Sequence, residues 1–359
     1  MKFDLLSLRA QNQRLLKSEF EKPEEVVRWM GAVQAQDFAG AKWGVAQRAG
    51  KTTDAEVEAS FNEGRILRTH AIRPTWHFVT TDDIRWILEL SSPRTHAACA
   101  YQYRVAELDD RVFRRSRKVI EKALEKHRHL TRDEIASALE TAGIAARGLR
   151  RSTIMIWSEL ERVVCSGPRR GKQFTYALLD ERAPNAKSLP RDEALAELVR
   201  RYFVSHGPAT IRDFVWWSGL TTAETRRGIE LLHPLLTSVT VGDRTYWFKE
   251  GNVASDRLRP SVYLLPDYDE FLIAFRDRDS RVFGLKDGLP KPSFETTAFL
   301  LVIDGLFAGT WRPKANSGRI FLNVKPFANL GPVHTRALLK EAKRYSDFIG
   351  KNIEIMFAT

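Results

Sequence analysis

The residues that could carry chemistry in this sequence are two glutamines, Gln34 and Gln36, in the segment GAVQAQDFAGAKWG (31–44). A carboxamide does not take up a proton at neutral pH, but it both donates and accepts hydrogen bonds. The chemistry open to such a pair is therefore orientation and electrostatic stabilisation rather than proton transfer.

The two glutamines lie at the end of a predicted amphipathic helix over residues 24–34. Side chains at positions i and i+2 of a continuous helix point about 200° apart. If both glutamines face one pocket, the backbone must leave the helix here, and Asp37 and Gly40 are consistent with such an exit. The alternative is that both are ordinary polar residues at a helix end.

The sequence lacks the motifs of the more common catalytic and metal sites. It contains no G-x-x-x-x-G-K-[ST], no G-x-G-x-x-G and no G-x-S-x-G. His70 and His77 are seven residues apart with no cysteine nearby, and two cysteines cannot supply a disulfide framework or a four-cysteine zinc site. We expect no metal, nucleotide or flavin cofactor.

Positive charge is the second informative property of the chain. Lys and Arg number 57 against 45 Asp and Glu, which gives a net charge of +12. Residues 104–132 carry ten cations against five acids, and residues 143–173 carry seven against two. Such a concentrated charge favours nucleic acid as the partner, because neutralising phosphates releases counterions. The alternative is a basic protein without an anionic partner.

The elements that must position these residues follow one order three times: helices, then a β-hairpin, as in the winged-helix variant of the helix-turn-helix. The middle copy is clearest, with a first helix over 117–127. Thr131 and Glu134 form a predicted capping box for its second helix. Ser152 is predicted to cap the third helix.

A hairpin with a cationic tip is predicted to end the middle copy, over residues 165–180. Glycine and proline mark its turn, and Phe174, Tyr176 and Leu178 alternate as in a strand. We expect the three cations at its tip, Arg169, Arg170 and Lys172, to bind phosphate. We expect the same of two arginines that precede the hairpin, Arg150 and Arg151.

The other copies and the C-terminal region complete the predicted α+β fold. The third copy has two further capping boxes and a hairpin that turns at Gly242-Asp243. The first copy is less regular, with helices at 4–16, 24–34 and 54–62 and a hairpin at 64–79. The last hundred residues predict a β-rich domain, a partial barrel, with strands in 262–275, 298–311, 318–327 and 352–357 and a helix at 334–349.

The predicted domains are three tandem winged-helix units and the β-rich domain: residues 1–103, 104–182, 188–250 and 260–359. A chain of 359 residues, of which 43% are hydrophobic, is long enough to bury a separate hydrophobic core in each of these four domains. No apolar run approaches about 20 residues, and the first residues contain no apolar stretch typical of a signal peptide. We therefore expect a cytoplasmic protein.

Segments along nearly the whole chain resemble the AlkZ-type winged-helix DNA glycosylases, a bacterial family that includes the YcaQ branch. The resemblance rests on residues 31–44 and on four further segments in the same order: EGRILRTHAIRPTWHFVTTDDIRWILEL, SGPRRGKQFTYALLDER, RRYFVSHGPATIRDFVWWSGLT and LLPDYDEFLIAFRDR. The family's Gln-x-Gln signature falls on Gln34-Ala35-Gln36, whereas the YcaQ branch carries Gln-x-Asp.

The resemblance implies a DNA glycosylase that excises N-alkylated purines, including bulky or crosslinked N7-alkylguanine. An N7-alkylguanine is already cationic. Its glycosidic bond is therefore weakened, and the base can leave without being protonated by an acid of the enzyme. Gln34 and Gln36 would then orient the water that attacks the anomeric carbon. We expect a monofunctional enzyme, because no lysine stands out for Schiff-base chemistry.

Other residues of these segments could contact DNA or line the cleft, each with a structural alternative. Asp37 could favour a cationic base, although a hydrogen bond at a helix end is the preferred interpretation. The group His70, Trp76 and His77 could contact DNA, with a half-buried core position preferred for the tryptophan. Asp267 and Asp269 could lie near a cationic lesion, or serve turns and pair with arginines.

The expected partner is double-stranded DNA carrying alkylated bases, bound by a monomer. The main alternative is a non-enzymatic winged-helix DNA-binding protein, such as a transcriptional regulator, because composition and repeats fit it equally. Such a regulator needs a recognition helix that presents base-reading side chains. The predicted third helices show no Asn/Arg row of that kind. A ligand-binding or scaffold protein with wings that contact other proteins is a further alternative.

Overall fold

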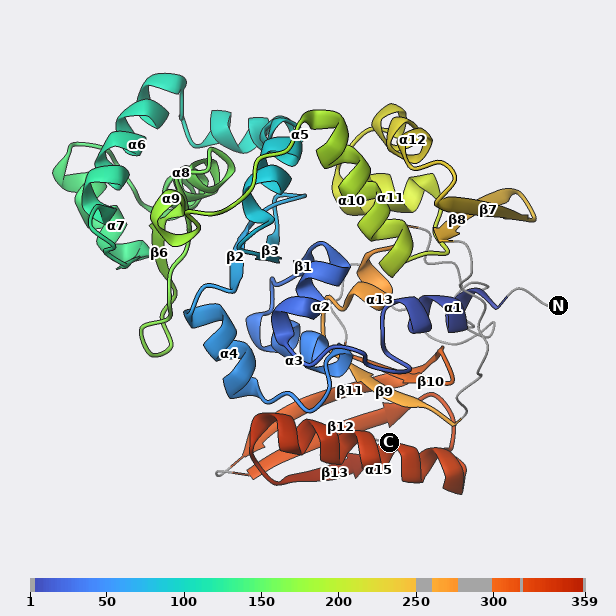
Figure 1. Ribbon diagram of the computed structural model, residues 1–359. Coiled ribbons are helices and arrows are strands. Elements are labelled where there is room, and N and C mark those ends of the chain that lie inside the picture. Colours follow the sequence, from blue (N-terminus) through green and yellow to red (C-terminus); the bar gives the residue numbers. More distant parts are fainter. Residues whose placement is uncertain (1–3, 250–259, 277–298, 317–318, 358–359) are drawn as a thin grey trace.

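The protein has a mixed α+β fold in which three groups of helices with short antiparallel sheets precede a larger sheet (Figure 1). The computed structural model describes residues 4–249, 260–276, 299–316 and 319–357. Within these ranges, no helix is both long and apolar enough to cross a bilayer. The predicted boundary at residue 250 lies outside the described residues.

The N-terminal group surrounds the glutamine segment. Its elements are α1 (Leu5–Asn12), α2 (Pro23–Met30), β1 (Val33–Gln34), α3 (Phe38–Arg48), α4 (Asp54–Asn62), β2 (Ile66–His70) and β3 (Trp76–Thr80). The strands form an antiparallel sheet in the order β1-β3-β2. The predicted helix over 24–34 is too long, because α2 ends before Gly31, whose φ of +82° leaves the helical region. The helix α3 was not predicted.

The middle group follows the predicted order closely. After α5 (Ile84–Val105), which follows the first hairpin and belongs to the predicted first unit, it comprises α6 (Asp110–Leu124), β4 (Leu130–Thr131), α7 (Arg132–Thr141), α8 (Gly148–Leu160), β5 (Val164–Ser166), β6 (Thr175–Leu178) and α9 (Leu179–Arg182). The capping box of Thr131 and Glu134 is confirmed at the start of α7. The predicted cap at Ser152 is wrong, because α8 already begins at Gly148 and the serine lies inside it, where its hydroxyl donates to the Gly148 carbonyl.

The third group consists of helices at one end of the molecule with a two-stranded sheet beside them. Its elements are α10 (Arg191–Ser205), α11 (Ile211–Ser218), α12 (Thr222–Leu231), β7 (Leu236–Val241) and β8 (Arg244–Lys249). Both predicted capping boxes are present, at Thr210 and at Thr221. The hairpin turns at Gly242-Asp243 as predicted.

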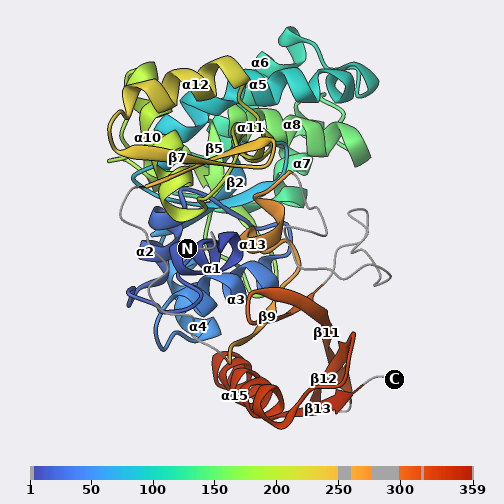
Figure 2. The ribbon, with the colours of Figure 1, turned by 90° about the vertical axis from the view of Figure 1, so that its right-hand side faces the viewer.

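The C-terminal region forms a five-stranded sheet. Its elements are β9 (Val262–Leu265), α13 (Glu270–Ile273), β10 (Leu300–Ile303), β11 (Leu306–Asn316), β12 (Arg319–Pro326), α15 (Pro332–Ile349) and β13 (Ile353–Phe357). The strand order is β13-β12-β11-β10-β9, with β12 and β13 parallel. The sheet is open between its edge strands β9 and β13. Figure 2 shows the curved sheet, and α15 contacts both edge strands.

The segment between β9 and α13 differs from its prediction as strand. After Leu265 the chain turns, and the carboxylate of Asp269 caps α13 by accepting from the Phe271 N–H. An aspartate at this position satisfies a backbone donor that a helix start leaves without a partner. The short helix α13 thereby lies against the N-terminal elements, between them and α11 (Figure 1).

A buried ion pair joins α13 to the N-terminal group. Arg48, at the end of α3, binds both carboxylate oxygens of Asp269 at 2.7 and 2.8 Å, and both side chains are almost fully buried. A Cβ atom at Gly44 would lie 3.1 Å from the same carboxylate. Only glycine therefore leaves ordinary contact distance between α3 and Asp269.

Replacing Arg48 by methionine should destabilise the protein by about 3–5 kcal/mol, because Asp269 would remain buried without its cation. Urea unfolding would measure the change. The control is Lys343→Met, which removes an exposed pair with Asp347 on α15 and should cost less than about 1 kcal/mol. Equal effects of the two substitutions would contradict this role of the Arg48–Asp269 pair.

Candidate active site

Gln34 lies in the short strand β1, where two side chains from distant parts of the chain fix it. Its backbone N–H donates to Glu270 Oε1 at 2.7 Å, and its side-chain Oε1 accepts from Arg73 Nη2 at 3.0 Å. The residue is 7% exposed and pairs with His77 of β3. The carboxamide is therefore held in one orientation, with its oxygen towards the arginine.

Gln36 lies two residues beyond Gln34, in the bend between β1 and α3. The Ala35 N–H donates to the Trp76 carbonyl at 2.7 Å, so the pairing with β3 continues beyond Gln34. Ala35, between the two glutamines, is fully buried. Gln36 is exposed, and its Oε1 accepts weakly from the Trp76 N–H at 3.4 Å. The chain leaves the helical conformation at Gly31, before both glutamines, rather than near Asp37 and Gly40.

Glu270 is the residue behind Gln34 that sequence reasoning missed. Its carboxylate is 1% exposed and also accepts from Trp217 Nε1 at 3.0 Å. His206 Nε2 lies 3.4 Å away, and burial lowers the pKa of that histidine. The sequence offers one signal for Glu270, its position directly after Asp269 in LLPDYDEF, and none for its contact with Gln34 236 residues earlier.

Arg73, in the turn between β2 and β3, is the second missed residue. Burial lowers the pKa of its guanidinium, and the Glu270 carboxylate opposes that shift. The guanidinium also lies 5.8 Å from the ring centre of Trp216, a partly exposed side chain of α11. Gln34 is thus surrounded by side chains from the N-terminal group, the third group and the C-terminal region.

The three predicted aspartates occupy different places. Asp37 caps α3 through the Ala39 N–H, which is the helix-end role preferred from the sequence. Asp269 is committed to Arg48 and to the cap of α13. Asp267 is partly exposed in the preceding turn, where it accepts from the Tyr268 N–H.

The two predicted histidines are buried, and Trp76 is half-buried between them and the surface. His70 Nδ1 lies 2.7 Å from a carboxylate oxygen of Glu159. His77 Nδ1 donates to the Thr75 carbonyl, while its Nε2 has no hydrogen-bond partner among the described residues. Burial, with Arg73 nearby, holds the pKa of His77 well below its usual 6.5.

The predicted phosphate-binding cations divide into two groups. Arg169 pairs with Glu58, Arg170 with Glu134, and Arg150 donates to three backbone carbonyls. Lys172 and Arg151 instead line a cavity of about 400 Å³ beside Trp76. The structure therefore separates these five cations into three that are bound within the fold and two that line the cavity, of which Arg151 also pairs with Asp133.

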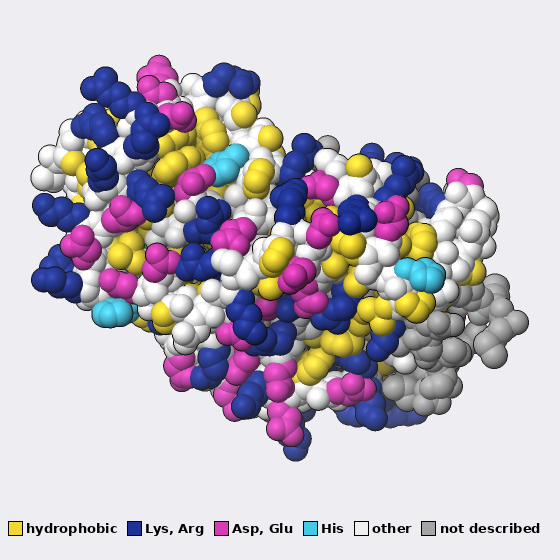
Figure 3. Space-filling view, turned by 45° about the horizontal axis from the view of Figure 1, so that its top comes forward, with side chains coloured by type: hydrophobic (Ala, Val, Ile, Leu, Met, Phe, Trp, Pro, Cys, Tyr) yellow, Lys and Arg dark blue, Asp and Glu magenta, His cyan; other side chains and the backbone are white. Residues whose placement is uncertain are grey.

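Exposed positive charge gathers over the middle group. Figure 3 shows many Lys and Arg side chains at the end of the molecule that carries α6. Six cations of this helix are exposed: Arg111, Arg114, Arg115, Arg117, Lys118 and Lys122. No cluster of His, Cys, Asp and Glu suited to a metal ion occurs within the described residues.

Comparison with known proteins identifies the family. The family profile described as DNA glycosylase AlkZ-like matches residues 27–348. The chain belongs to the AlkZ-like DNA glycosylase family. It is therefore a DNA glycosylase, which confirms the resemblance predicted from the sequence and favours the enzyme over the non-enzymatic DNA-binding alternative.

A curated relative and a solved structure of the family come from Streptomyces sahachiroi. The chain is 24% identical to the interstrand DNA cross-link repair glycosylase of that organism, over 93% of this chain and 92% of the relative. The solved structure of the DNA glycosylase AlkZ from the same organism superposes with a TM-score of 0.80 at 20% identity, covering 98% of both chains. The AlkZ-like fold therefore extends over the whole chain.

The buried histidines should make this glycosylase less stable in mild acid. His77 and His206 have lowered pKa values when folded, so on unfolding near pH 5 each takes up a proton that the folded state excludes. The free energy of unfolding should fall by up to about 1.4 kcal/mol per pH unit for each imidazole below about pH 6.5. Urea unfolding between about pH 7 and pH 5 would measure it.

His77→Gln should reduce this pH dependence, because it removes one of the protons gained on unfolding. The exposed His233 provides the control, and His233→Gln should leave the pH dependence unchanged. An unchanged slope in His77→Gln would show that this imidazole titrates alike in both states.

Proposed function

We propose that this glycosylase excises N-alkylated purines of the N7-alkylguanine type, including bulky or crosslinked adducts, from double-stranded DNA. The printed name of the Streptomyces relative, an interstrand cross-link repair glycosylase, supports this class of substrate. The observation that carries the proposal is Gln34, whose side chain is held by Arg73 and whose backbone is held by Glu270.

The geometry around Gln34 suits the placement of a water molecule. A carbonyl oxygen has two lone pairs, and Arg73 occupies one of them on Gln34 Oε1. The second lone pair can accept a hydrogen bond from water, and we place the carboxamide of Gln36 beside the same water. Oriented in this way, the water attacks the anomeric carbon, while the proton it loses passes to solvent or to the departing base.

The sugar develops positive charge as the bond to the cationic base breaks. The buried carboxylate of Glu270 places negative charge behind Gln34, and this charge offsets the positive charge of Arg73. Fixed charges and dipoles in a water-poor site stabilise such a transition state without reorganisation. We assign Glu270 and Arg73 as positioning residues that act through Gln34.

The proposed architecture consists of three winged-helix units, with boundaries at 1–103, 104–182 and 188–250, before the C-terminal region 260–359. The order of helices and hairpins in each group supports this assignment. Most glycosylases flip the damaged base into a deep pocket, which a crosslinked base cannot enter readily. Winged helices that together form an open surface suit bulky adducts better, and we propose that a monomer binds DNA in this way.

Substituting either glutamine by alanine should lower single-turnover excision of N7-methylguanine by about 100-fold, because the attacking water loses an orienting carbonyl. Duplex binding by Gln34→Ala and Gln36→Ala should remain close to that of the wild type. Gln102→Ala, on the exposed face of α5, is the matched control and should retain full activity. Near-complete excision by Gln36→Ala would refute the proposed role of the pair.

Borohydride should trap no covalent enzyme–DNA adduct, because water rather than an amine attacks the sugar. Excision should leave abasic sites that break only on treatment with alkali. Gel analysis of the product before and after alkali would measure this, with a lysine-dependent bifunctional glycosylase as positive control. A trapped adduct of the wild-type enzyme would contradict the monofunctional mechanism.

A further inference from the structure

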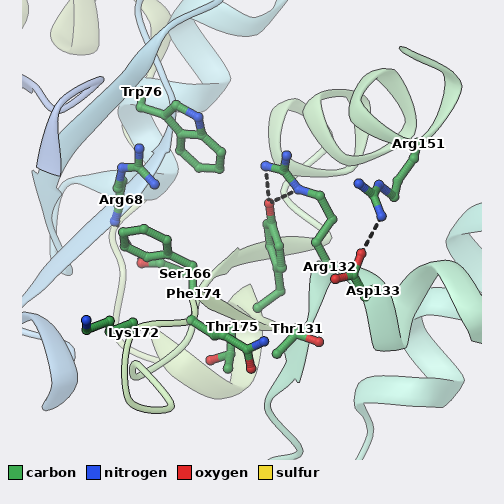
Figure 4. A pocket seen from close by; sticks show the side chains of 12 residues that line it. Arg68, Trp76, Thr131, Arg132, Asp133, Arg151, Ser166, Lys172, Phe174 and Thr175 are labelled. Carbon is green, nitrogen blue, oxygen red and sulfur yellow. Dashed lines mark hydrogen bonds and ion pairs between the residues drawn. The ribbon is translucent and has the colours of Figure 1, made fainter. Parts of the chain in front are cut away.

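The cavity beside Trp76 lies between β2 and β3 of the first group and α7 and β6 of the middle group. Figure 4 shows Arg68 between the rings of Trp76 and Phe174 on one side, with Arg132 and Arg151 on the other. Lys172, from the hairpin tip, also lines the cavity. Its walls therefore carry four cations, and the only carboxylate of the described residues that line it, Asp133, is bound by Arg151.

Arg68 is a buried cation with unused donors. It is 7% exposed, and its Nε donates to the Ala35 carbonyl at 3.0 Å. Its guanidinium carbon lies 4.1 Å from the ring centre of Trp76 and 4.6 Å from that of Phe174. The two terminal nitrogens form no hydrogen bond with any described residue. Burial lowers the pKa of Arg68 to about 10, so the group remains charged at neutral pH.

The surroundings of Arg68 favour an anion over a stacked base. Glu159 is the carboxylate whose charge acts most strongly on Arg68, and one of its oxygens is already paired with His70. Trp76 is covered by Arg68 and contacted by His70, whose ring centre lies 4.1 Å away. The rings thus hold the arginine rather than offer a free face for a nucleobase, while the fixed fork of guanidinium donors matches the oxygens of a phosphate.

We propose that this cavity binds one phosphodiester group of the DNA strand that passes Gln36, with Arg68, Arg132 and Lys172 as its cationic ligands. The inference rests on the proposed function, which brings DNA to the glutamines. The Arg68 Nε contact with Ala35 and the Trp76 N–H contact with Gln36 connect the cavity directly to the Gln-x-Gln segment. A phosphate held here fixes the register of the strand relative to Gln36.

The first test measures the salt dependence of binding to an undamaged duplex by fluorescence anisotropy. Removing one cation that binds a phosphate should lower the slope of log K against log salt by about 1. Arg68→Met, which keeps an unbranched stem between the rings, and Lys172→Gln, at an exposed position, should each lower the slope. Lys343→Gln is the matched control, because it removes one positive charge, as each cavity variant does, but from α15. Unchanged slopes in both cavity variants would overturn the proposal.

The second test locates the phosphate on the strand. Methylphosphonates replace single phosphates around one N7-methylguanine, made resistant to excision by a 2′-fluoro sugar. One position should weaken wild-type binding roughly 10-fold, as expected for a charge-assisted hydrogen bond, and should weaken Lys172→Gln binding by a smaller factor, because only Arg68 and Arg132 still contact that phosphate. Additive effects of the methylphosphonate and the substitution at every position would overturn the proposed contact.

The two tests separate this inference from the proposed function. Lower slopes in the cavity variants of an enzyme that releases no alkylated base would support the cavity and refute the proposed substrate. Normal excision with unchanged slopes and additive effects would support the proposed function and refute the cavity as a phosphate site.

Discussion

The candidate site depends on two consecutive buried carboxylates, Asp269 and Glu270, which bring the C-terminal region against the N-terminal group. Asp269 binds Arg48 with both oxygens, and Glu270 accepts the backbone N–H of Gln34. Buried carboxylates are tolerated only when cations or hydrogen-bond donors satisfy them. The requirement to satisfy both at once fixes α13 against α3 and β1, and it thereby fixes the strand that carries the glutamines.

The two glutamines lie in and directly after a strand rather than at a helix end. Positions i and i+2 of a continuous helix point about 200° apart, whereas here Gln34 belongs to β1, Gln36 follows it in a bend, and Ala35 between them is buried in the core. Gly31 makes the change from helix to strand, since its φ of +82° is one that glycine adopts without strain. Arg73 then fixes the carboxamide of Gln34 in one orientation.

The cations of the protein fall into two classes, those bound within the fold and those that face solvent, and the net charge does not distinguish them. Some arginines, including Arg150 and Arg169, satisfy carbonyls and carboxylates within the fold. Others, including those exposed on α6, face solvent. Arg68 belongs to neither class, because it is buried between the rings of Trp76 and Phe174, and we assign its charge to the proposed phosphate site.

The sequence by itself determined the local structure and the candidate chemistry. Capping boxes such as Thr131–Glu134 and turns such as Gly242-Asp243 depend on neighbouring residues, so their pattern predicts them. The Gln-x-Gln motif and the family resemblance likewise pointed to Gln34 and Gln36. The prediction that Ser152 caps a helix was wrong. The helix already begins at Gly148, so the serine lies inside it.

Only the tertiary structure decided which side chains surround the glutamines. Glu270 meets Gln34 across 236 residues, and Arg68 meets the Gln-x-Gln segment through a sheet whose register no short window specifies. The segment after Leu265, predicted as strand, forms α13 where Asp269 and Glu270 meet Arg48 and Gln34. Burial makes each unsatisfied charge costly, and this cost selects partners by their position in space rather than by their separation along the chain.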